Sequence, residues 1–197
     1  MNEEDFALKE VDLSKIKNTI KELLNKQLNN NKISKEEEEF INDAIKIYPD
    51  IVIEIGLGPD QFFDLIEKNE QLSFNILIDL CQRPYYSDYI SLFIERKWSL
   101  NSLKVMNKLL QKIEFPKSYI YCYIIHCISE FKNQKNKDIK IRMSKIFLFF
   151  ICNLLEHEHI TVDSIPPSID EFFKVDCENP DILLLKEKME KYRKEHP

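Results

Sequence analysis

Apolar residues recur every three or four positions along most of this chain, which is the spacing that places them on one face of an α-helix. The first apolar stripe comprises Leu13, Ile16, Ile20, Leu23 and Leu24. It ends in the polar run of residues 29–32, and a second stripe begins after Ser34 and stops at Pro49. Ser34 and Glu37 have the spacing of a capping box, in which each side chain bonds the backbone N–H of the other residue. We therefore predict an N-terminal helix, a flexible Asn-rich link and then a second helix.

The same periodicity continues toward the C-terminus. Residues 51–55 alternate as in a strand, but because helical patterns flank them we assign them to a helix. Ser99 is a candidate N-cap, and Pro59 and Pro116 suit helix starts. The further helices are expected near residues 59–66, 72–80, 89–94, 100–110, 119–131, 138–156, 168–173 and from 180 onward.

These elements predict an all-α protein of about ten helices. Amphipathic helices in a linear series bury their apolar stripes against sequence neighbours, so we expect a helical-repeat-like stack, an α-solenoid without a fixed sequence period. Residues 1–32 form the predicted N-terminal helix and link, and residues 33–195 form the predicted helical-repeat-like domain. The two glycines both lie in residues 56–58, which disfavours hairpin-rich folds and glycine-rich phosphate loops.

Charge and cysteine usage indicate where the protein works. The net charge of −6 gives no general attraction to nucleic acid or anionic lipid. The five cysteines are odd in number and lie mostly among apolar neighbours, as free thiols do in a reducing compartment. The N-terminus is acidic and has no signal-peptide pattern, and the most apolar run, 146–151 with Leu154 and Leu155, is about half the roughly 20 residues of a membrane helix. We expect a cytoplasmic protein, or one that is also nuclear, without membrane attachment.

Catalytic and metal-binding patterns are weak. Cys122 and His126 have the i, i+4 spacing of two zinc ligands on one helix, but the sequence offers no matching second pair. We interpret them as a core thiol and a structural histidine. The carboxylates of residues 36–39 suit the first turn of a helix, where negative charge interacts favourably with the helix dipole. Since no nucleophile or phosphate-loop motif occurs, we expect no enzyme activity, cofactor or metal.

Two surfaces are candidates for binding. Aromatic residues at helix junctions and on the helix near 119–131 are candidate anchors for a protein partner, with core packing as the alternative role: Tyr85, Tyr86, Trp98, Tyr119 and Tyr121. A basic segment next to these aromatics is a candidate for single-stranded RNA, with a solvated loop as the alternative: Lys132, Lys135, Lys137, Lys140 and Arg142. The mixed charges of residues 186–195 are interpreted as a solvated helix face.

Several short motifs, in order from about residue 34 to residue 155, resemble one known family. They are Ile55-Gly56-Leu57 with Pro59, Asp64-Leu65-Ile66-Glu67, Ser99-Leu100 with Ser102, Val105, Asn107 and Leu109, Tyr123-Ile124, and Cys127-Ile128-Ser129. The sequence with these motifs resembles the C-terminal domain of subunit 11 of the Ccr-Not mRNA deadenylase complex. The resemblance fades in the C-terminal tail.

The resemblance implies a function that composition alone does not give. The family belongs to a complex that shortens mRNA poly(A) tails through separate nuclease subunits, so it implies a noncatalytic adaptor in mRNA decay and post-transcriptional regulation. In that family an N-terminal domain docks with subunit 10 on the Not scaffold, and the C-terminal domain recruits regulators such as gametogenetin-binding protein 2. Residues 1–32 do not resemble the docking domain. We expect binding to a regulator of this kind, with RNA binding through the basic segment as the alternative.

Overall fold

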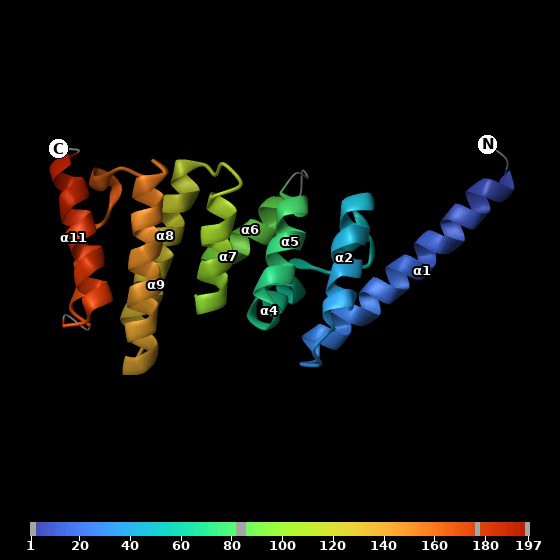
Figure 1. The fold of residues 1–197 in the computed structure, drawn as a ribbon, viewed down its shortest axis with the longest axis horizontal. Helices are drawn as coiled ribbons and strands as arrows, with labels where there is room; N and C mark the ends of the chain where they lie inside the picture. Colours follow the sequence, from blue (N-terminus) through green and yellow to red (C-terminus); the bar gives the residue numbers. More distant parts are fainter. Residues whose placement is uncertain (1–2, 82–85, 176–177, 196–197) are drawn as a thin grey trace. The chain divides into compact units, whose positions relative to one another are not determined.

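The computed structural model describes residues 3–81, 86–175 and 178–195, with side chains from residue 12 onward. These residues form eleven α-helices, two short 3-10 helices and no strand (Figure 1), which confirms the predicted all-α class. The chain divides into two compact units, Met1–Leu92 and Phe93–Pro197. Among the described helices, none combines the length and apolar character needed to cross a bilayer.

The first unit contains five helices and most of a sixth. They are α1 (Glu3–Leu28), α2 (Lys35–Ile47), α3 (Ile51–Glu54), α4 (Pro59–Lys68), α5 (Glu70–Leu80) and α6 (Tyr86–Glu95), which continues into the second unit. Helix α1 packs against α4 and α2, while α5 packs against both α2 and α4. Fully buried side chains such as Ile20, Ile41, Phe62 and Leu72 come from four of these helices and form one apolar core.

The polar run after α1 closes the helix. Asn30 has a φ of 64°, and the N–H groups of Asn30 and Asn31 donate to the carbonyls of Gln27 and Lys26 at 3.1 and 3.0 Å. This is the hydrogen-bond pattern of a Schellman motif, in which asparagine tolerates the left-handed residue. The Lys68 ammonium donates to the Leu28 carbonyl and to Asn30 Oδ1, so the end of α1 is also tied to α4.

Gly56 forms a second helix stop of the same kind. Its φ is 81°, and the N–H groups of Gly56 and Leu57 donate to the carbonyls of Ile53 and Val52 at 2.8 and 3.2 Å. A Cβ at this position would meet no atom within 4 Å. Backbone conformation alone therefore favours glycine here, because no neighbouring helix comes close enough to exclude a side chain.

The second unit is built around one long apolar helix. It contains α7 (Leu100–Leu110), α8 (Lys117–Asn133), α9 (Lys137–Glu156), α10 (Asp170–Phe173) and α11 (Pro180–Glu195), with 3-10 helices at Val162–Ser164 and Pro167–Ile169. Helix α9 packs against α7, α8, α10 and α11, so it is the central helix of this unit (Figure 1). Phe147 and Phe150 of α9 are fully buried, and the Phe147 ring lies 4.5 Å from that of Phe172.

Within each unit the helices pack on distant as well as adjacent elements. Helix α1 contacts α4, α2 contacts α5, and α7 contacts α9, in addition to the contacts between chain neighbours. The contacts within each unit do not test whether the helices form a solenoid or whether a domain boundary lies at residue 32. Both stay predictions.

Candidate protein interaction site

The predicted anchor Trp98 lies in the core of the second unit. Its side chain is 4% exposed, and its ring meets that of Phe147 edge-on at 5.8 Å. The core-packing alternative therefore applies to this tryptophan, and the side chain is not on a surface where a partner would meet it. Trp98 lies one residue before the N-cap of α7, and α7 packs against α9, the helix that carries Phe147.

The other predicted anchors differ in exposure. Tyr86 and Tyr119 are half-buried, and Tyr119 stacks on Phe115 with ring centroids 5.6 Å apart. Tyr121 is 47% exposed on α8, and Ile125, one turn later, is 41% exposed. The two side chains are four positions apart and therefore share one helix face. Ile125 was not among the predicted anchors, because only aromatic residues were considered. Tyr85 lies outside the described residues.

The basic segment spans the end of α8, the following turn and the start of α9. Lys132 pairs with Glu171 at 3.3 Å, and the Lys140 ammonium lies 4.8 Å from the centre of the Phe131 ring. Lys135, Lys137 and Arg142 are exposed. The neighbouring rings of Tyr123 and Phe131 are each only 1% exposed, so neither presents a face on which a base stacks.

The two residues of the candidate zinc pair, Cys122 and His126, have different surroundings. The interpretation of Cys122 as a core thiol is wrong, because its side chain is exposed. His126 Nε2 donates to the Arg96 carbonyl at 2.7 Å, which is a structural role. Among the residues that the structure describes, no three His, Cys, Asp or Glu side chains gather as a metal-binding group.

Three other thiols are buried or half-buried. Burial raises the pKa of Cys81 to about 12 and that of Cys152 to about 11, and it raises the pKa of Cys127 well above the ordinary range. These thiols therefore stay protonated at neutral pH and lack the thiolate that nucleophilic chemistry requires.

The polar residues that carry the family resemblance have structural roles in two cases. Ser99 and Ser102 form a capping box at α7, with Ser102 N donating to Ser99 Oγ at 2.9 Å, so the predicted N-cap is confirmed. Asn153 Nδ2 of α9 donates to Asn107 Oδ1 of α7 at 3.2 Å. Asp64 and Ser129 are exposed.

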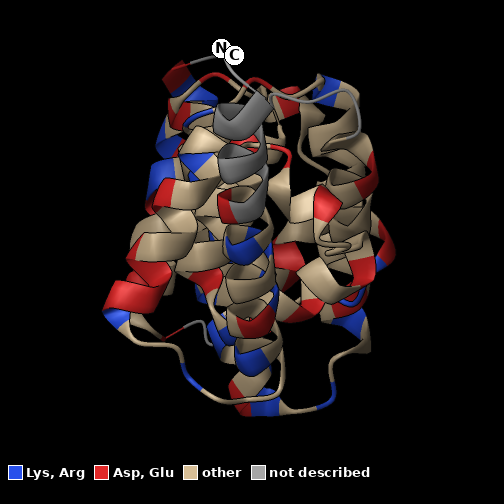
Figure 2. Cartoon of the chain, turned by 90° about the vertical axis from the view of Figure 1, so that its right-hand side faces the viewer, with Lys and Arg blue, Asp and Glu red and all other residues tan. Residues whose placement is uncertain are grey.

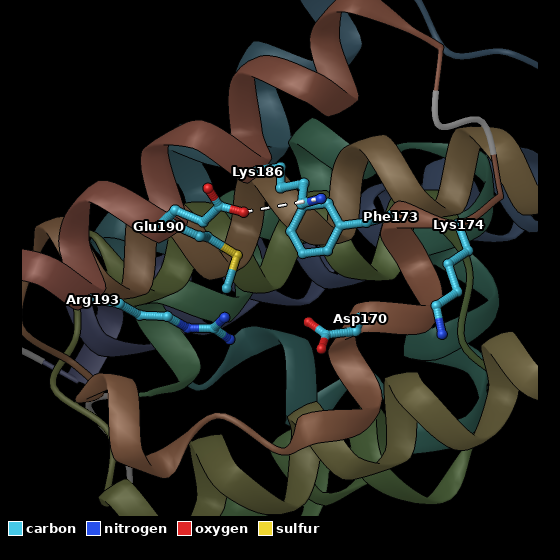
Figure 3. Close-up of a pocket in the computed structure, with 7 residues that line it drawn as sticks. Asp170, Phe173, Lys174, Lys186, Glu190 and Arg193 are labelled. Carbon is cyan, nitrogen blue, oxygen red and sulfur yellow. Dashed lines mark ion pairs between the residues drawn. The ribbon is translucent and has the colours of Figure 1, made fainter.

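A concavity of about 400 Å³ lies between α10 and α11, within the second unit (Figure 3). Its lining residues are Asp170, Phe173, Lys174, Lys186, Met189, Glu190 and Arg193. The four residues from α11 follow the spacing i, i+3, i+4 and i+7, which places them on one helix face. Phe173 and Met189 are 8% and 2% exposed and form its apolar floor, and Lys186 pairs with Glu190 at 3.9 Å.

Sequence reasoning missed this concavity because residues 186–195 were interpreted as a solvated face. The signal that was available is Met189, an apolar residue among charged neighbours on a helix. Figure 2 shows Lys and Arg interspersed with Asp and Glu over the described helices, in keeping with the modest net charge of −6.

The fold defines an all-α protein made of two compact helical units, with side chains of helix faces forming its candidate sites. Residues 66–177 match the family CCR4-NOT transcription complex subunit 11. A Dictyostelium discoideum protein described as CCR4-NOT transcription complex subunit 11 is 24% identical over 156 residues, which cover 79% of this chain and 24% of that protein. The chain therefore belongs to the CCR4-NOT transcription complex subunit 11 family, and the resemblance is confirmed. This chain spans about a quarter of the length of that relative.

Proposed function

We propose that this chain is a noncatalytic adaptor domain of the CCR4-NOT complex, which binds a regulatory protein and so acts in mRNA deadenylation, mRNA decay and translational or transcriptional regulation. The observation that carries the proposal is family membership, which rests on the match over residues 66–177 and on the relative named as a subunit of that complex. The cytoplasm, with the nucleus in addition, is the proposed location.

Exposed apolar side chains support a role in protein binding. Tyr121 and Ile125 share one face of α8, and Phe149 of α9 and Leu184 of α11 are 52% and 57% exposed. Apolar side chains that gather on helix faces are what partner helices and peptides bury on association. The proposed partners are the Not scaffold and subunit 10 of the complex, together with a regulator resembling gametogenetin-binding protein 2.

The test is a tagged pull-down of this chain from its own cells, with nuclease added and with mass spectrometry as the readout. Recovery of deadenylase subunits or of one regulator is the expected result. Tyr121→Ala should weaken that recovery. Tyr48→Ala is the control and should leave it unchanged, because Tyr48 is similarly exposed, at 39%, but lies in the first unit and not on α8. Unchanged thermal melting of both variants would show that recovery reports binding and not folding.

One result would contradict the adaptor function. If only ribonucleoproteins are recovered and they disappear with nuclease, RNA binding by the basic segment replaces it. The exposed side chains of Lys135, Lys137 and Arg142 are the observation that keeps this second function in the test.

A further inference from the structure

We propose that the concavity between α10 and α11 binds a short peptide segment of a partner protein, in which an apolar side chain is flanked on both sides by Asp or Glu. This inference rests on the proposed adaptor function, because it assigns a place and a chemistry to the partner contact. It depends on three features of the pocket: its floor, its cations and its two carboxylates.

The floor suits one apolar side chain. The cavity of about 400 Å³ falls within the size range of small-ligand and side-chain pockets, roughly 300–1,000 Å³. The Phe173 ring and the Met189 thioether lie at its base, and methionine adapts its shape to different apolar groups. An aliphatic or aromatic side chain that enters here leaves water and packs on this floor and on the methylene stems of the lining Lys186 and Arg193.

The cations lie on either side of this floor. Figure 3 shows Lys174 and Arg193 on opposite sides of Phe173, with Lys186 beside the ring. Lys186 forms an ion pair with Glu190, whereas no ion pair joins Lys174 or Arg193 to another residue that the structure describes. The Arg193 guanidinium can bind a carboxylate through two parallel hydrogen bonds, which suits an Asp or Glu on one side of the apolar residue. The Lys174 ammonium is a compact positive charge that suits an Asp or Glu on the other side.

The two carboxylates favour a peptide over a polyanion. Asp170 points into the pocket toward Arg193 (Figure 3), and Glu190 lies on the same face of α11 as Arg193. The lining holds three cations against two carboxylates, so its small positive excess suits a ligand with a few separated negative charges better than a nucleic-acid backbone, whose phosphates are closely spaced. The two carboxylates can accept hydrogen bonds from the backbone N–H groups of an extended peptide, which a nucleic acid does not offer.

The experiment selects a displayed library of random peptides on the purified chain and measures the affinity of the enriched peptides by fluorescence anisotropy. The test variant is Lys174→Glu with Arg193→Glu. The control variant is Lys191→Glu with Lys194→Glu, which makes the same charge change on exposed residues of α11 outside the pocket. Thermal melting of both variants checks folding.

The expected result is enrichment of peptides with an apolar residue between acidic residues. Their Kd should rise about tenfold or more in the test variant, stay near the original value in the control, and rise with added salt. Enriched peptides that lack acidic residues, or that bind both variants equally, would overturn the inference. Binding of poly(A) RNA that is lost in the test variant would also overturn it, because the ligand would then be a nucleic acid.

The same variants separate this inference from the proposed function. If the test variant still captures CCR4-NOT subunits or the regulator as well as the original chain does, the adaptor function stands and the pocket assignment fails. If the original chain captures none of them yet binds acidic peptides through Lys174 and Arg193, the pocket assignment stands and the adaptor function fails.

Discussion

Two buried serines of the second unit differ in their hydrogen bonds. Ser102 Oγ accepts from the Ser99 N–H at 3.0 Å, whereas Ser144 Oγ has no hydrogen-bond partner among the described residues. A buried hydroxyl without a partner costs free energy, while a capping hydroxyl satisfies the free N–H groups at a helix start. Both hydroxyls are buried, so the difference in what each contributes to the free energy of unfolding comes from the hydrogen bond that Ser102 makes and Ser144 does not.

We expect Ser144→Ala to leave the free energy of unfolding unchanged or to raise it by up to about 1 kcal/mol, because it removes an unsatisfied polar group. Ser102→Ala should lower it by about 1 kcal/mol, because the Ser99 N–H loses its partner. Urea denaturation of the two variants measures both changes. A larger loss for Ser144→Ala than for Ser102→Ala would show that Ser144 Oγ has a partner in solution.

Gly56 tests whether backbone conformation or packing selects a glycine. Because its φ is 81° and its surroundings are open, Gly56→Ala should destabilise the protein by about 1–2 kcal/mol through the left-handed backbone alone. Gly58, the N-cap of α4, has a φ of −73° and also lies in open space. Gly58→Ser should therefore cost little, since serine is a favourable N-cap. Equal losses in thermal melting would contradict this explanation.

At the scale of the element, the junction between α1 and α2 depends on one carboxylate. Glu37 Oε2 accepts from the Ser34 N–H at 2.6 Å, and both Glu37 oxygens lie 2.9 Å from the Lys26 ammonium of α1. The hydrogen bond from Lys26, followed by that from Ser34, lowers the pKa of Glu37 below its ordinary value of 4.5. The charged carboxylate therefore stabilises the folded state.

The pH dependence follows from this direction. A lowered pKa in the folded state gives a stabilisation that is present above the ordinary pKa and is lost as pH falls through the folded value. The melting temperature of the original chain should exceed that of Glu37→Gln at neutral pH, and the difference should shrink progressively below about pH 4.5. Glu39→Gln is the control, because Glu39 pairs with Lys35 at 4.0 Å on an exposed face. A pH-independent difference would contradict the ionic contribution.

Local signals explain why the elements could be predicted from sequence. The Ser34–Glu37 capping box and the Ser99 N-cap involve residues three positions apart, so sequence spacing alone specifies both helix starts. The strand-like alternation of residues 51–55 was correctly assigned, because α3 (Ile51–Glu54) is a short helix. Asn30 was the exception: the left-handed turn that it forms is a specific helix stop, whereas the sequence suggested a flexible link.

At the scale of the whole molecule, the candidate site depended on contacts between distant residues. The pocket requires α10 and α11 to lie together, which no spacing within either helix specifies. Trp98 was considered as a surface anchor because it precedes a helix, but its burial depends on Phe147, 49 positions away in sequence. Periodicity therefore identified which faces are apolar, but it did not identify which helix covers each face.

RNA binding is a property of the whole charge distribution, and the structure limits its strength. Lys132 is paired with Glu171 and Lys140 lies over the Phe131 ring, which leaves Lys135, Lys137 and Arg142 for phosphate contacts. If each contacts one phosphate of a single strand, a log–log plot of affinity against salt should have a slope no steeper than about −2. We expect weak poly(A) binding with such a slope in a filter-binding or anisotropy titration.

The triple change of Lys135, Lys137 and Arg142 to Glu should remove this weak binding and leave capture of the protein partner unchanged. The matched control reverses three other exposed cations, Lys15, Lys32 and Lys194, none of which lies in the basic segment. Because long-range attraction depends on net charge, the control should weaken RNA binding slightly, whereas loss of direct phosphate contacts should abolish it. A slope steeper than about −4 would require more phosphate contacts than these three residues provide and would make RNA the principal ligand.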